Sequence, residues 1–120
     1  MAVQSPQRAT ALYCYGVMSA ATAKPQRKSG LGGKPVEPVV YGELAALTSP
    51  APAGKARAKR ADLLRHFEVL GTAFEQGPVL PMRFGIVFDD EESLVKDFLE
   101  PRHGELAEQH AVVSHRARAR

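Results

Sequence analysis

The segment Pro78–Phe88, which reads PVLPMRFGIVF, constrains the fold of this chain more than any other stretch. Its bulky apolar residues fall on alternate positions, and they are Leu80, Met82, Phe84, Ile86 and Phe88. Because successive side chains of a strand point to opposite faces, the alternation predicts one strand that sends all five into the core. Arg83 falls on the other face. There it would either pair with a carboxylate, such as Glu43, or bind a partner protein.

One helix is predicted before this strand in the sequence, and another is predicted after it. The first covers residues 56–76, where apolar residues recur at helical spacing and predict one inward stripe of Leu63, Phe67, Leu70 and Phe74. The second runs from Asp90 to about Gln109 and begins with acidic residues, which suit the positive end of the helix dipole. Pro101 cannot continue a regular helix, so we expect a bend or stop near Glu100 and a second short helix after it.

The N-terminal half predicts strands at residues 11–18 and 39–48. Between them, residues 23–38 combine glycine, proline and four basic residues, a composition that predicts a mobile loop. We also expect a flexible N-terminus at 1–10 and a disordered basic tail at 111–120. The order strand, strand, helix, strand, helix is typical of an α+β domain, here over residues 11–110, with an antiparallel sheet and helices packed on one of its faces.

Composition narrows the class of protein. The chain has 120 residues, of which 44% are hydrophobic, so it can form one modest core. No apolar run approaches the roughly 18 residues of a membrane span, and the N-terminus shows no secretion signal. The single cysteine, Cys14, rules out an internal disulfide and fits a reducing compartment. We therefore expect a cytoplasmic protein without membrane contact.

Catalytic and ligand-binding motifs are weak. Cys14 lies in mid-strand between tyrosines, where a buried structural thiol is more common than a nucleophile. The four histidines show no zinc-binding spacing with it. The stretch Gly32-Gly33-Lys34 is not a phosphate loop, because Pro35 stands where that motif needs serine or threonine. We predict a protein that is not an enzyme and that binds no metal or cofactor.

Basic residues leave a nucleic-acid-binding alternative open. The loop at 23–38 and the start of the first helix are both basic, and Arg83–Phe88 partly matches the aromatic strand on which RNA-recognition domains stack bases. That pattern needs a glycine after the basic residue, which is missing here. The predicted strand also places Phe84 and Phe88 on the same face as three other apolar residues. The sequence therefore favours a core strand over a stacking platform.

Three segments resemble a known family. Leu80–Gly85, followed by Val87 and Phe88, resembles the signature of the gas vesicle protein GvpL/GvpF family. Leu12–Val17 resembles the opening strand of that family, and Gly42–Pro50 resembles its second strand, in the same order. The resemblance extends from Leu12 to about Gln109 and so covers the family's N-terminal domain only. It implies a modified ferredoxin-like domain whose closing strand is missing or altered.

The resemblance also implies a function. A chain of this family would be an accessory protein of gas vesicle formation, located at gas vesicles, that binds the gas vesicle shell protein during assembly. Other gas vesicle accessory proteins would be further partners. Arg83 and Glu43 are the candidate partner-binding residues. The alternative is a ferredoxin-like nucleic-acid-binding module that uses the basic loop and helix start, and salt-sensitive binding to oligonucleotides would distinguish it.

Overall fold

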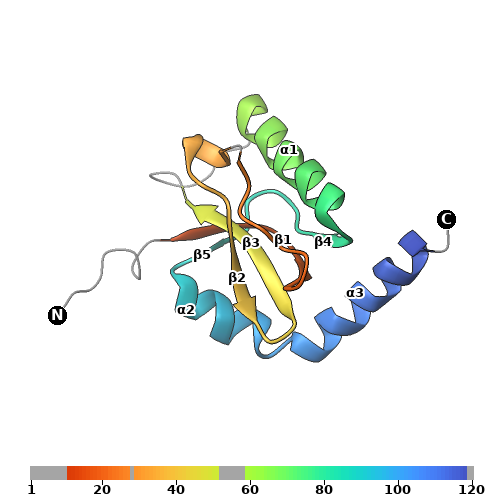
Figure 1. Cartoon of the computed structure of the whole chain (residues 1–120). Coiled ribbons are helices and arrows are strands. Elements are labelled where there is room, and N and C mark those ends of the chain that lie inside the picture. Colours follow the sequence, from red (N-terminus) through yellow and green to blue (C-terminus); the bar gives the residue numbers. More distant parts are fainter. Residues whose placement is uncertain (1–10, 28, 52–58, 119–120) are drawn as a thin grey trace.

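The structure is a computed structural model that describes residues 11–27, 29–51 and 59–118. Five strands form one antiparallel sheet in the order β2-β3-β1-β4, with β5 also paired to β1 (Figure 1). The strands are β1 (Leu12–Ser19), β2 (Glu37–Tyr41), β3 (Leu44–Pro50), β4 (Val79–Pro81) and β5 (Val87–Phe88). The helices are η2 (Leu31–Gly33), α1 (Arg60–Gln76), α2 (Glu91–Leu94), η3 (Val95–Leu99) and α3 (His103–Arg118).

The central strand β1 supplies buried side chains to both faces of the sheet. A bulge at Tyr15 interrupts its pairing with β3, since Cys14 pairs with Thr48 and Gly16 with Leu47. The extra residue shifts the alternation of side chains by one position. Tyr13, Tyr15 and Met18 accordingly contribute to one hydrophobic core, and Cys14 and Val17 contribute to the other.

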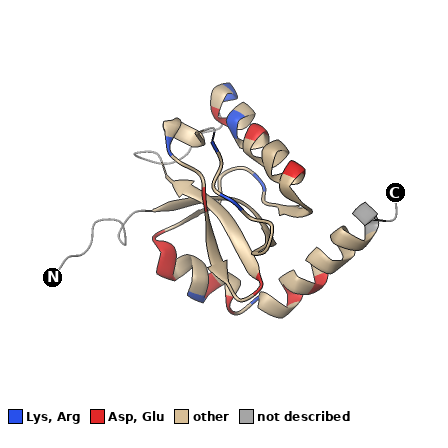
Figure 2. Ribbon diagram, viewed as in Figure 1, with Lys and Arg blue, Asp and Glu red and all other residues tan. Residues whose placement is uncertain are grey.

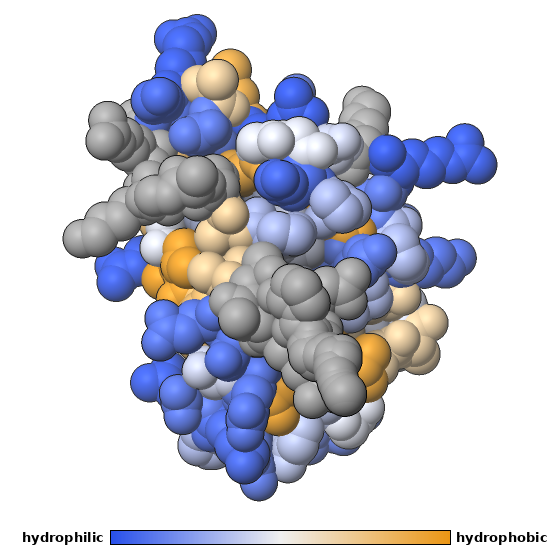
Figure 3. All heavy atoms as spheres, turned by 90° about the vertical axis from the view of Figure 1, so that its left-hand side faces the viewer, coloured by the Kyte–Doolittle hydropathy of each residue, from blue (hydrophilic) through white to orange (hydrophobic). Residues whose placement is uncertain are grey.

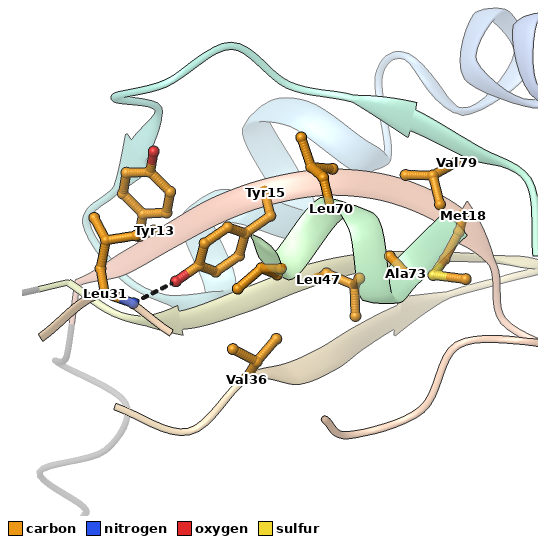
Figure 4. Packing of buried hydrophobic residues seen from close by; sticks show 10 residues of the cluster. Tyr13, Tyr15, Met18, Leu31, Val36, Leu47, Leu70, Ala73 and Val79 are labelled. Carbon is orange, nitrogen blue, oxygen red and sulfur yellow. Dashed lines mark hydrogen bonds between the residues drawn. The ribbon is translucent and has the colours of Figure 1, made fainter. Parts of the chain in front are cut away.

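Helix α1 covers the first of these cores. The buried residues of this core, several of which are drawn in Figure 4, are Tyr13, Tyr15, Met18, Leu31, Val36, Leu47, Val69, Leu70, Ala73 and Val79. The Tyr15 hydroxyl accepts a hydrogen bond from the backbone N–H of Leu31 at 2.9 Å and lies 2.7 Å from Ser49 Oγ (Figure 4). These contacts satisfy a buried hydroxyl that would otherwise destabilise the core.

The second core lies on the opposite face of the sheet. Its buried residues are Cys14, Val17, Val39, Leu44, Ala46, Leu94, Leu99 and Leu106, so α2, η3 and α3 cover this face. Figure 1 shows α1 on one side of the sheet and α2 with the start of α3 on the other. The α+β class with an antiparallel sheet is confirmed. The expectation that the helices pack on one face is wrong, because the sheet presents apolar side chains on both.

The segment 78–88 forms two short strands rather than one. β4 ends at Pro81, and the chain turns through Phe84 and Gly85 before β5 begins. Gly85 has φ +99, a conformation that other residues rarely adopt. The bulky residues therefore separate. Leu80, Met82, Ile86 and Phe88 pack against the second core and Phe84 against the first, and all five are only partly buried.

The buried side of α1 differs from the predicted stripe. His66, Val69, Leu70 and Ala73 are buried, and Leu63 is half-buried. Phe67 and Phe74, which were expected in the core, are 61% and 51% exposed. The sheet contacts a neighbouring arc of the helix, and that arc includes a histidine that an apolar pattern does not count.

The glycine-rich segment 23–38 is structured where it is described. Leu31 and Val36 are buried in the first core, and Gln26 Nε2 donates to the backbone carbonyl of Val69 in α1 at 3.0 Å. Lys28 lies outside the described residues. The prediction of a mobile loop overlooked these two apolar residues, which anchor the segment beneath α1.

Two further elements differ from expectation. The single strand predicted at 39–48 is a hairpin of β2 and β3, turned at Gly42, which has φ +60. The tail predicted to be disordered is helical as far as Arg118, because α3 runs through it.

The predicted stop near Glu100 is confirmed, since the chain turns at Glu100–Arg102 before α3 begins. Within the described ranges, no helix is both long and apolar enough to cross a membrane.

Candidate protein-binding site

The signature residues span the end of β4, the loop of residues 82–86 and β5, and this loop is fixed to β1 at both ends. The backbone N–H of Met82 donates to the carbonyl of Tyr15, and that of Cys14 donates to the carbonyl of Ile86, both at 2.9 Å. β1 therefore keeps its hydrogen bonds while the chain between Met82 and Ile86 bends outward. A bend of this kind changes the direction of the side chains in the loop, which no longer alternate as they would in a strand.

A buried pair of side chains secures the bend from below. The Tyr13 hydroxyl accepts a hydrogen bond from the N–H of Gly85 at 3.0 Å and lies 2.8 Å from His66 Nδ1. His66 Nε2 lies 3.0 Å from the carbonyl oxygen of Met82. Because a carbonyl can only accept, Nε2 carries the proton and Nδ1 accepts from Tyr13. The loop, α1 and β1 are thus joined through one neutral imidazole.

Burial sets the protonation of this pair. Desolvation lowers the pKa of His66 below its usual value, and the hydrogen bond to Met82 opposes that shift only in part. Desolvation likewise raises the pKa of Tyr13 to about 12, against the hydrogen bond from Gly85. Both groups are therefore uncharged at neutral pH. The aromatic rings of Phe67 and Phe84 lie 5.3 and 5.8 Å from that of His66 and help to exclude water.

Arg83 is exposed at the tip of this loop. Among the residues that the structure describes, no carboxylate lies within ion-pair distance of its guanidinium group. The predicted pairing with Glu43 is not formed. Glu43 lies in the turn of the β2–β3 hairpin, where its Oε1 is 3.1 Å from Nε2 of His103 at the start of α3. The two candidate partner-binding residues therefore belong to different parts of the surface.

The edge of the sheet at β2 offers little room for an added strand. The backbone N–H of Gln26 donates to the carbonyl of Val36 and so occupies the edge just before β2. Pro38 lies within β2 and has no N–H to donate. Proline at an exposed edge is a common protection against unwanted strand pairing. A partner that contacts this edge would meet the exposed side chain of Val40 rather than a free ladder of backbone groups.

The structure gives Cys14 the properties of a structural residue. Its side chain is fully buried, and desolvation raises the pKa of its thiol to about 12. Since the thiolate is the nucleophilic form, this thiol is unreactive at neutral pH. No group of three side chains suited to a metal ion occurs within the described parts of the chain. Asp90 has a structural role too, because its Oδ1 caps α2 by accepting from the N–H of Ser93 at 2.7 Å.

The described part of the sheet has no aromatic platform for RNA. Phe84 and Phe88 pack on opposite faces, so they cannot form one stacking platform. In Figure 2, basic and acidic residues are mixed along α1, and acidic residues predominate on α2 and on the part of α3 that is not grey. Figure 3 shows one face, on which hydrophilic side chains surround separate small hydrophobic areas. Lys55 and Arg57, which belong to the proposed basic helix start, lie outside the described residues.

These features define a small α+β domain whose most distinctive element is a buried tyrosine–histidine pair beneath an exposed loop. The family model described as "Gas vesicle synthesis protein GvpL/GvpF" matches residues 11–117. The chain belongs to this family. The signature residues, which carried that resemblance in the sequence, are those of this loop and of the strand ends on either side of it.

Named relatives agree with this assignment. "Gas vesicle protein F" of Streptomyces sp. (strain CB03234) is 42% identical over 86 residues, which are 69% of this chain and 36% of the relative. "Gas vesicle protein F" of Dolichospermum flosaquae is 33% identical over 97 residues, which are 79% of this chain and 40% of the relative. All of these relatives are named as gas vesicle proteins, and nothing in the comparisons supports a nucleic-acid-binding module.

Two crystal structures share the fold. The gas vesicle protein GvpF of Anabaena sp. PCC7120 superposes with a TM-score of 0.71 at 30% identity, covering 85% of this chain and 43% of that protein. GvpF of Microcystis aeruginosa gives a TM-score of 0.72 at 30% identity, covering 88% and 44%. The chain thus spans between 36% and 44% of the length of these four proteins.

The stripe predicted for the first helix did not include His66, and sequence reasoning did not find its contact with Tyr13. The two residues are 53 positions apart, and no local pattern joins them. The available signal was a histidine on the inner side of an apolar helix together with two tyrosines in a buried strand.

Proposed function

We propose that this protein is an accessory protein of gas vesicle formation and binds the gas vesicle shell protein during assembly. The observation that carries the proposal is the match over residues 11–117 to a family described by gas vesicle synthesis. The protein would then be located at gas vesicles, and other gas vesicle accessory proteins would be further partners. It would act by binding rather than by catalysis.

The physical need for such a protein is clear. A subunit that lines a gas space exposes apolar surface in water before it is assembled, and such surface aggregates. An accessory protein that covers the subunit until it joins the shell prevents this aggregation. The signature loop supplies a suitable contact, because a rigid support leaves Arg83 exposed and free to meet a partner. Arginine is favoured at interface hot spots.

Co-precipitation with purified gas vesicle shell protein tests the proposal. The intact chain should bind, and Arg83→Ala should weaken binding by at least about 30-fold, as loss of a hot-spot arginine does. Arg102→Ala is the matched control, since Arg102 is an exposed arginine in the turn before α3, and it should bind normally. Glu43→Gln tests the second candidate residue. Each variant must show the melting temperature of the intact chain.

Two outcomes would overturn parts of the proposal. If the folded chain does not bind shell protein at any concentration tested, while a full-length relative does, this chain is not by itself a shell-binding protein. If the intact chain and Arg83→Ala bind equally, the loop is not the contact. Salt-sensitive binding to an oligonucleotide at physiological ionic strength would instead restore the nucleic-acid alternative.

A further inference from the structure

The outer side of α1 carries an unusual amount of exposed apolar surface. Leu64, Phe67 and Phe74 are 54%, 61% and 51% exposed, and Gly71 lies between them on the helix. At 100° per residue these four positions fall within an arc of about 80°, and they extend about 15 Å along the axis. We call this arc the α1 stripe. No other helix lies beside it in Figure 1.

The α1 stripe continues the buried face of the helix. His66, Val69, Leu70 and Ala73 occupy the adjoining arc and face the sheet. The apolar side of α1 is therefore about twice as wide as the part that the sheet covers. An apolar helix face that its own domain leaves uncovered is typical of a binding surface.

The residues of the stripe can pair with those of a second copy. Gly71 has nothing within 4 Å of the position where a Cβ would lie, so the surface of the helix is open there. Phe67 projects one turn away. If two copies of α1 pair antiparallel about the midpoint of the stripe, Phe67 lies opposite the partner's Gly71. Leu64 then lies opposite the partner's Phe74, and each ring fills a space in the other helix.

The charges at the ends of the stripe fit the same arrangement. The N-terminal end has the exposed Arg60 and the C-terminal end has the exposed Glu75. Antiparallel pairing brings Arg60 within reach of the partner's Glu75 at both ends, whereas parallel pairing would bring like charges together. On the flank, Glu68 already has an ion pair with Arg65 at 3.6 Å, so its charge is partly balanced within the helix.

We infer that the α1 stripe is a self-association surface, on which a second copy of this chain docks through its own α1 in antiparallel orientation. The interface is isologous, as in most two-fold dimers, with each residue contacting its symmetry-related complement. The contact involves one helix from each copy, so it forms a dimer that depends on protein concentration. The signature loop with Arg83 is not part of the stripe and stays available to another partner.

Sedimentation equilibrium between about 1 µM and 1 mM tests this inference with the intact chain. The mass should rise from 13.0 kDa toward twice that value as the concentration increases. Phe67→Glu should raise the dissociation constant at least about 100-fold, because it places a charge at the centre of the contact. Val112→Glu is the control, since Val112 is also an exposed apolar residue, 52% exposed, but lies on α3. It should leave the dimer unchanged.

Charge exchange and cross-linking test the orientation. Arg60→Glu and Glu75→Arg should each weaken the dimer, and the double variant should restore it. A mixture of Phe67→Cys and Gly71→Cys chains should form a disulfide-linked dimer in oxidised glutathione faster than either variant alone. Cys14 does not compete, because it is fully buried.

Three results would overturn the inference. The intact chain could remain monomeric over the whole concentration range. The dimer could survive Phe67→Glu while Val112→Glu disrupts it. A monomeric chain could lose the binding of purified shell protein on Leu64→Glu, in which case the stripe belongs to the shell protein and not to a second copy.

Discussion

The Tyr13 hydroxyl donates a 2.8 Å hydrogen bond to Nδ1 of His66, although the two residues are 53 positions apart in the chain. This bond joins the central strand to α1, and each partner also holds the backbone of the signature loop, Tyr13 at Gly85 and His66 at Met82. The position of the loop therefore depends on a neutral histidine and a protonated tyrosine. Two of the predictions below follow from that dependence.

The stability of the fold should decrease as the pH falls below about 6.5. Burial lowers the pKa of His66 in the folded state, so the unfolded chain takes up a proton at a higher pH than the folded chain does. The free energy of unfolding is then fully retained above the unfolded pKa and is lost below it. Urea unfolding at about pH 7.5 and 5.5 measures the effect. That range leaves Asp90 ionised, since the hydrogen bond from Ser93 lowers its pKa.

Two variants show whether His66 is the group responsible. His66→Gln should be less stable at pH 7.5 but should lose much of the pH dependence. His115→Gln removes an exposed histidine on α3 and should keep it. Equal pH dependence in the intact chain and His66→Gln would contradict the assignment.

Tyr13→Phe should destabilise the domain by about 2–4 kcal/mol. The substitution leaves the buried Nδ1 of His66 and the part-buried N–H of Gly85 without their partner, and the loss of a partner costs a buried group about 1–3 kcal/mol. Tyr41→Phe, on the β2–β3 hairpin, is the control and should cost less than about 1 kcal/mol. Hydrogen exchange should also show the amide of Gly85 exchanging faster in Tyr13→Phe. Unchanged protection of that amide would argue against the network.

Gly30→Ala should destabilise the domain, because its new methyl group would overlap the Tyr15 hydroxyl and lie 2.8 Å from Val36 Cγ2. Overpacking of this kind costs about 1–3 kcal/mol. Gly104→Ala is the matched control. It lies in α3 with nothing within 4 Å of the added atom, so it should be neutral or should stabilise by up to about 1 kcal/mol. Thermal unfolding of both variants measures the difference, and equal melting temperatures would mean that segment 29–36 is not packed as described.

Cys14 should resist thiol reagents in the folded protein. Burial raises its pKa to about 12, so at pH 8 only about one thiol in 10⁴ is ionised, and the side chain is inaccessible as well. Mass spectrometry after iodoacetamide treatment should show no modification under native conditions and complete modification in concentrated urea. Rapid native labelling would indicate that β1 opens easily, and would also reopen the question of a reactive thiol.

Sequence patterns predicted local features of the chain better than its tertiary contacts. The helix after Asp90, its capped start and its interruption before α3 all follow from local chemistry, because a carboxylate caps a helix and Pro101 cannot continue one. Family membership also followed from the sequence, since the signature is a short contiguous stretch. The function proposed from it stays a prediction, as do the roles of Arg83 and Glu43.

The tertiary structure decided which side of each helix and strand is buried. Alternation in Pro78–Phe88 suggested one strand, but the Tyr13–His66 pair holds a bend at Gly85 and sends Phe84 to the opposite core from its neighbours. Spacing in α1 suggested that Phe67 is inside, yet the sheet covers the adjoining arc and leaves it exposed. A periodic pattern indicates that one side of a helix or strand is apolar. Residues far away in the chain determine which part of that side is buried against another element. The bulge at Tyr15 likewise exchanges the cores in which Val17 and Met18 pack, relative to unbroken alternation, and only the pairing of β1 with β3 shows it.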